Sequence, residues 1–140
     1  MSKTTPPLAF PSRFLIVTLG GQCLALNAES ICGLLTLVEA GNVENPTVQG
    51  LVYKAINLTD RLSLPHDAGG PNARVVLLSE QEVRGCVRVA TVLGLLEVQQ
   101  SQLVPLPMQF CGPERYWYQG IILFAQSIAL VLNTTWVLQE

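Results

Sequence analysis

The sequence predicts an all-β fold made of short strands and single-turn helices. Its 140 residues are enough for one domain with a sizeable core. Short apolar runs are rich in β-branched and aromatic residues, which favour strands. Turn signals recur about every 8–12 residues, a spacing typical of sandwiches and barrels. Helical patterns extend over one turn only, so the chain is expected to form a β-barrel type of domain.

The chain opens with a predicted hairpin. Residues 13–19 (RFLIVTL) form the first strand, and residues 22–26 return beside it. Gly20 and Gly21 between them supply the positive φ angles of a two-residue turn. Asn27 is placed to cap a short helix over 28–32. A further strand at 34–38 and a loop at 39–47 complete this part of the chain.

The stretch from 48 to 65 (VQGLVYKAINLTDRLSLP) is predicted to be the centre of the fold. A strand over 51–53 is expected to reverse at Lys54 and return over 55–56. Asn57 then caps a helical turn over 58–62.

The loop over 65–72 (PHDAGGPN) breaks all periodicity and is the predicted boundary between two halves. Beyond it, a hairpin is expected from 73–78 and 83–89. Gly94 indicates a bulge in the strand over 92–98. A last hairpin over 116–132 ends at Asn133, which caps a closing helical turn. Asn-Leu-Thr at 57–59 and Asn-Thr-Thr at 133–135 form a weak echo of one another.

Composition limits the possible functions. Charged residues make up 13% of the chain and the net charge is −2, so no basic stripe is available for nucleic acid. So low a charge leaves an apolar surface, as interaction proteins have. Residues 1–11 lack the apolar core of a signal peptide and are expected to be a flexible lead-in. We therefore expect a cytoplasmic protein.

The residues that could carry chemistry are few. Cys23, Cys32, Cys86 and Cys111 lie far apart, and the chain has one histidine, so no zinc pattern is present. We expect reduced thiols, no metal and no cofactor. An enzyme would have only His66, Asp67 and Asp60 as ingredients, and His66 is expected to be a solvated loop residue. No catalytic residue is therefore predicted.

One alternative is a membrane helix over 116–139, which carries no charge. The polar residues Gln126 and Ser127 stand at its centre, where they would be costly in a bilayer. We predict a hairpin instead, with no integral membrane span.

Several motifs resemble the CheW-like family of chemotaxis adaptors. The opening strand and turn at 14–20, Leu26-Asn27 followed by Ile31, and Asn57-Leu58 with Arg61-Leu62 match in order and spacing. The strand ending in Leu-Glu-Val at 96–98 and the closing segment at 130–138 are also similar. The likeness covers residues 14–138, within a domain predicted over 12–140.

The resemblance implies two small five-stranded β-barrels on a shared apolar core and no chemistry. It implies binding to the regulatory domain of a CheA-like histidine kinase and to the cytoplasmic tip of chemoreceptors. Ile31, on the first helix, and Gly50, at the start of the central hairpin, are the matching partner-binding positions. Lys54 stands where the shortened hairpin would meet partners.

The chain departs from the family at that hairpin. The family's Asn-Leu-Arg-Gly turn has no match at Lys54, which implies a weakened or altered receptor contact. The predicted function is a non-enzymatic adaptor that couples chemoreceptors to a CheA-like kinase. The alternative is a β-barrel protein that binds a small apolar ligand or associates with a membrane.

Overall fold

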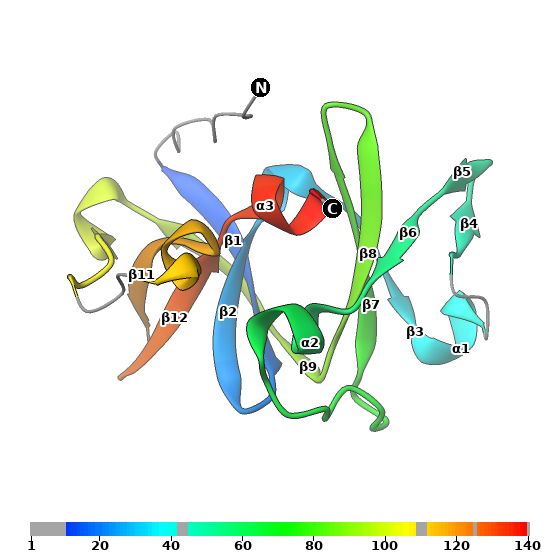
Figure 1. The fold of residues 1–140 in the computed structure, drawn as a ribbon, viewed down its shortest axis with the longest axis horizontal. Helices are drawn as coiled ribbons and strands as arrows, with labels where there is room; N and C mark the ends of the chain where they lie inside the picture. The colour runs from blue at the N-terminus through cyan, green and yellow to red at the C-terminus, as the bar shows by residue number, and fades with distance from the viewer. Residues whose placement is uncertain (1–10, 42–44, 109–111, 125, 140) are drawn as a thin grey trace.

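The computed structural model describes residues 11–41, 45–108, 112–124 and 126–139 (Figure 1). The strands are β1 (Ser12–Leu19), β2 (Gln22–Asn27), β3 (Ile31–Thr36), β4 (Thr47–Val48), β5 (Leu51–Val52), β6 (Lys54–Ile56), β7 (Arg74–Glu80), β8 (Val83–Val89), β9 (Thr91–Val98), β10 (Leu103–Val104), β11 (Tyr118–Phe124) and β12 (Ser127–Leu132). The short helices are η1 (Ala28–Ser30), α1 (Leu37–Ala40), α2 (Leu58–Leu62), η2 (Gln100–Gln102), η3 (Pro113–Tyr116) and α3 (Thr134–Leu138).

The strands form two larger sheets and one hairpin. The first sheet has the order β10-β11-β12-β2-β1-β9, and the second has the order β3-β7-β8-β6. The third is the β4-β5 pair. Figure 1 shows the first sheet on the left, the second on the right, and α2 and α3 between them. The predicted all-β class is confirmed, although neither larger sheet closes into a five-stranded barrel.

Both larger sheets bury residues on both faces. Alternate residues of a strand point to opposite faces, so Leu15 and Val17 enter one cluster while Phe14 and Ile16 enter another. The largest cluster lies between the sheets, where Leu24 of β2 and Val87 of β8 are both buried. This cluster is the shared core that the resemblance implied. A third, smaller cluster covers the other face of the second sheet with Tyr53, Val75, Leu77 and Cys86.

Two predicted backbone features are confirmed. Gly20 and Gly21 have φ angles of 58° and 79°, and they join Leu19 to Gln22 in register. On β9, Gly94 pairs with Ile16 while Val92 pairs with the next residue along, so the strand bulges there. Gly94 itself has a φ of 143°, which favours glycine.

The echo at 57–59 and 133–135 is a repeated structural unit. β6 pairs in parallel with β8, and β12 pairs in parallel with β2. β6 and β12 are each followed by an asparagine that caps a helix. The Asn57 side chain accepts from the Asp60 N–H at the start of α2, and that of Asn133 accepts from the Trp136 N–H at the start of α3. The two units place α2 and α3 next to the shared core.

The prediction for the central stretch was wrong in one respect. The chain reverses at Gln49 and Gly50, with φ angles of 52° and 80°, and these residues join β4 to β5. Lys54 stands in β6, which pairs with β8. A glycine that seemed to begin a strand is thus a turn residue, because its positive φ angle suits a two-residue hairpin.

The first helix and the following strand also differ from expectation. η1 ends at Ser30, so Ile31 begins β3 and does not stand on a helix. β3 in turn ends at Thr36, whose side chain caps α1 in a capping box with Glu39. The strand predicted over 34–38 therefore ends early, because the capping box at Thr36 starts a helix there.

Two further predictions concern the halves and the last hairpin. The described residues within 116–139 fold as the end of η3, β11, β12 and α3, so the predicted hairpin is confirmed. Among the described residues, no helix has the length and apolarity to cross a membrane. Both larger sheets take strands from each side of the 65–72 loop, and a division into halves there stays a prediction. Residues 1–10 of the predicted lead-in lie outside the described residues.

Candidate partner-binding surfaces

The second sheet aligns two of the three predicted partner-binding residues in one row. Ile31 pairs with Leu78, Leu78 pairs with Gly85, and Gly85 pairs with Lys54. Ile31 and Lys54 therefore lie on opposite edge strands of the sheet. Three inter-strand spacings separate them, which is about 14 Å at the usual spacing. Ile31 is half-buried and packs against the shared core, whereas Lys54 is exposed.

Gly50 lies apart from this row, at the tip of the β4-β5 hairpin. A Cβ atom there would meet no described atom within 4 Å, so close packing does not require this glycine. Its φ of 80° does. The adjacent Leu51 and Val52 are 39% and 57% exposed, which makes the hairpin an apolar projection at one end of the molecule.

Two clefts flank the edge strand β6, a feature that sequence reasoning missed. One has a volume of about 1100 Å³ and is lined by Val75, Cys86 and Arg88 from the second sheet and by Thr59 and His66 beyond β6. The other has a volume of about 550 Å³ and lies against the C-terminal end of α3. Lys54, Ala55 and Ile56 line both clefts, so β6 is a ridge between them.

The two clefts concentrate positive charge. Lys54 lines both, Arg88 lines the larger, and Arg61 and Arg84 line the smaller. These are four of the eight Lys and Arg residues of the chain. Among the described lining residues there is no Asp or Glu. In a chain of net charge −2, this side is locally basic.

The structure brings together two of the three possible catalytic ingredients. His66 Nε2 lies 3.0 Å from Asp60 Oδ1, and its Nδ1 lies 3.1 Å from Thr59 Oγ1. Asp67 instead accepts a hydrogen bond from the Gly20 N–H. His66 was expected to be a solvated loop residue, and it is 68% exposed but bound at both nitrogens.

This histidine group holds the loop after α2 in place. The Thr59 hydroxyl donates to Asn57 Oδ1 at 2.7 Å, so its proton is not available to His66. Asp60 accepts from the Asn57 amide as well. The arrangement lacks a free nucleophile beside a base, which nucleophilic catalysis needs.

The cysteines do not gather. Cys23, Cys32 and Cys86 are free thiols, and Cys111 lies outside the described residues. Burial raises the pKa of the Cys86 thiol, which makes it less reactive. Within the described ranges, no three His, Cys, Asp or Glu residues stand close enough to hold a metal ion.

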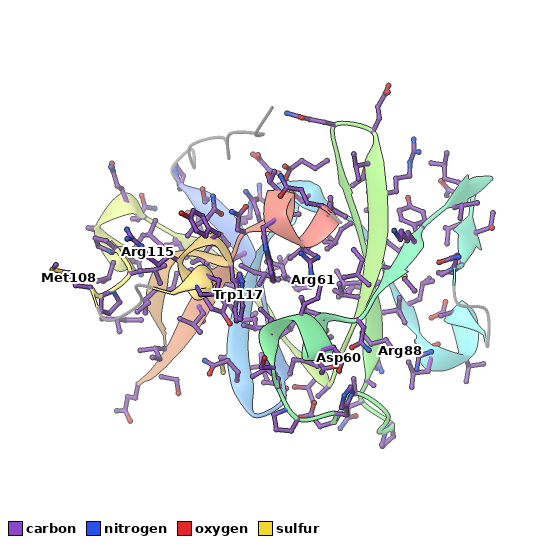
Figure 2. All side chains as sticks on the ribbon, in the orientation of Figure 1. Asp60, Arg61, Arg88, Met108, Arg115 and Trp117 are labelled. Carbon is purple, nitrogen blue, oxygen red and sulfur yellow. The ribbon has the colours of Figure 1, made fainter. Side chains whose placement is uncertain are left out.

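A cation–aromatic stack joins the two capped helices at the centre of the molecule (Figure 2). The Arg61 guanidinium lies 4.0 Å from the ring centroid of Trp136, which stacks on Trp117 at 5.5 Å. Arg61 also donates to the carbonyl oxygens of Trp136 and Val137, at the C-terminal end of α3. Of the three consecutive aromatic residues Tyr116, Trp117 and Tyr118, Tyr116 alone is well exposed, at 72%.

Further exposed apolar side chains lie on the first sheet and its loops. Leu93 and Leu95 project from the edge strand β9, and Met108 is 95% exposed. Figure 2 shows Met108 and Arg115 at one end of the molecule and Arg88 near the other. Large exposed apolar side chains such as these are candidates for protein docking contacts.

Together the fold and its surfaces define a small two-sheet interaction domain with apolar projections and a basic pair of clefts. A family model described as the CheW-like domain matches residues 13–140, and the chain belongs to this family. Comparison with curated protein sequences finds no significant match. A similar solved fold is the crystal structure of scaffolding protein TtCheW from Thermoanaerobacter tengcongensis. It aligns with a TM-score of 0.70 and 11% identity over 88% of this chain and 89% of that one.

Proposed function

We propose that this chain is a non-enzymatic adaptor that couples chemoreceptors to a CheA-like histidine kinase in a chemotaxis-type system. The match of the CheW-like family over residues 13–140 carries this proposal. The exposed apolar side chains at both ends of the molecule support it, because adaptors need more than one docking surface. We place the adaptor in the cytoplasm, where such kinases and receptor tips meet.

The receptor contact is assigned to the β4-β5 hairpin. Thr47 and Val48 form β4, and Gln49 and Gly50 form the turn. We infer that Thr47-Val48-Gln49-Gly50 corresponds to the family's Asn-Leu-Arg-Gly segment. In that correspondence the hairpin is not shortened, and Gln49 stands where the family carries arginine. Loss of that cation weakens attraction to an acidic receptor group but leaves the shape of the turn.

The other predicted residues fit the proposal in different ways. Gly50 holds the left-handed turn that presents Leu51 and Val52. Lys54 offers a charge on the β6 ridge. Ile31 supports the β3 edge and presents only part of its side chain, so its contribution to binding is through the shape of that edge.

The test is a pull-down with the purified regulatory domain of the CheA-like kinase from the same genome. We expect the chain to retain this domain, and to raise kinase autophosphorylation when receptor membranes are added. The chain alone should transfer no phosphate. Failure to bind either the kinase or the receptors in this assay, with the fold intact by circular dichroism, would refute the adaptor assignment.

A further inference from the structure

We propose that the outer edge of β6 binds an extended acidic segment of a partner protein as an added strand. The proposal rests on the adaptor function for the kind of ligand, a protein, and on the geometry of β6 for the manner of binding. Among the described strands, β6 ends the second sheet and pairs on one side only, with β8. Edge strands of this kind are templates for strand addition.

The backbone of β6 already makes the hydrogen bond that an added strand would make. The Ala55 N–H points away from β8 and donates to Asn45 Oδ1 at 2.9 Å. Asn45 is exposed, and its side-chain carbonyl accepts the hydrogen bond that the backbone carbonyl of a partner strand would accept. The Pro46 carbonyl accepts from the Tyr53 N–H at 2.9 Å just before β6, so a partner strand would displace the Asn45 side chain alone and pair with β6 beyond Pro46.

The two clefts lie where the side chains of an added strand would go. Successive side chains of a strand point to opposite faces of a sheet. The cleft of about 1100 Å³ contains Cys86 and Arg88, and that of about 550 Å³ contains Val137 and Leu138. An extended peptide along β6 would fill both in alternation, which is how strand addition obtains specificity.

The arginine side chains of the two clefts favour an acidic partner segment. Arg88 in the larger cleft and Arg84 in the smaller have no carboxylate partner among the described residues, and no described Asp or Glu lines either cleft. Two acids near the clefts already have partners. Asp60 pairs with His66, and Glu80 accepts from Thr135 and Ser30. Acidic side chains placed in these clefts would meet arginine at short range.

The direct test uses a fluorescein-labelled, N-acetylated Glu-Val peptide with the repeat Glu-Glu-Val-Val, which presents Glu to both clefts, and measures anisotropy with the purified chain. We expect saturable binding that weakens as salt rises. A peptide with Lys in place of each Glu should bind at least tenfold more weakly. The same Glu-Val peptide with alternate backbone nitrogens methylated should also lose at least tenfold, because it cannot form the ladder.

Variants locate the site. Arg84→Gln with Arg88→Gln should reduce affinity about tenfold, whereas Arg13→Gln, an exposed arginine on β1, should leave it unchanged. Asn45→Ala should raise affinity, since it removes the competitor for the Ala55 N–H. Equal binding of the methylated peptide, or no loss in the double arginine variant, would overturn the proposal.

The two proposals can fail separately. Retention of the kinase domain together with no peptide binding would leave the adaptor function standing and exclude strand addition at β6. Peptide binding with the expected variant effects, but no retention of kinase or receptor, would leave the β6 site standing and exclude the assigned partners.

Discussion

Single residues around α3 show how unevenly its polar atoms are satisfied. Thr134 is buried, and its hydroxyl has no hydrogen-bond partner among the described residues. The neighbouring Thr135 hydroxyl is bonded to the Glu80 carboxylate. An unpaired buried hydroxyl is costly, whereas removal of one partner from a bond to a charged group leaves that group unsatisfied.

Substitution at these two threonines should therefore change stability in opposite directions. Thr134→Val keeps the shape and is expected to raise the free energy of unfolding by about 1 kcal/mol. Thr135→Val removes the bond to Glu80 and should lower it by about 1–3 kcal/mol. Urea denaturation of both variants beside the parent chain measures the difference. A loss of stability in Thr134→Val would show that its hydroxyl has a partner after all.

Residue signals predicted some local features and missed others for clear reasons. Asn57 and Asn133 were predicted as caps because a short side-chain acceptor just before a helical turn can bond a free backbone N–H of that turn. Gly20 and Gly21 were predicted as a turn because paired glycines favour positive φ angles. Gln49 gave no such signal, since glutamine seldom adopts its φ of 52°. The reversal was therefore predicted at Lys54, four residues beyond Gly50.

At the scale of elements, Arg61 connects the two repeated units. It stands in the last turn of α2 and donates to the last carbonyl groups of α3, where the helix dipole is negative. Its planar fork can satisfy both carbonyls and still lie over Trp136. Burial lowers the pKa of Arg61, which reflects the cost of placing a cation there.

Arg61→Met should lower the free energy of unfolding by about 2–4 kcal/mol, because two charge-assisted hydrogen bonds and a cation–π contact are lost. Arg61→Lys keeps the charge but not the planar fork. Its free energy of unfolding should lie between those of the parent chain and Arg61→Met. Denaturant titration with tryptophan fluorescence follows the unfolding and the environment of Trp136 together. If Arg61→Lys were as stable as the parent chain, the fork geometry would be unimportant.

Long-range pairing was beyond prediction at this scale. The apolar run at 55–56 indicated a strand, but no local pattern shows that it runs parallel to β8 and forms the sheet edge. The clefts depend on that placement, since their walls come from α2, β7, β8, α3 and the 65–72 loop. The positions of Lys54 and Arg88 in one cleft thus arise from tertiary structure alone.

At the scale of the whole molecule, the residues that stabilise the fold lie in the apolar clusters, away from the turns proposed to bind partners. The shared cluster joins both sheets and both capped helices, so the core does not depend on the hairpin turns. Those turns lie at the periphery, where substitutions usually alter specificity and spare the fold. The low overall charge means that kinase binding should draw mainly on apolar contact and depend little on salt.

Gln49→Arg should therefore restore receptor attraction without affecting the kinase contact. One exposed cation contributes up to about 1 kcal/mol, so receptor affinity should rise by up to about fivefold and become more sensitive to salt. Gln81→Arg is the matched control, because Gln81 has nearly the same φ, 51° against 52°, in the turn between β7 and β8. Sedimentation with receptor membranes and the kinase pull-down measure the two affinities. An equal gain in both variants would mean that net charge, and not the β4-β5 turn, attracts the receptor.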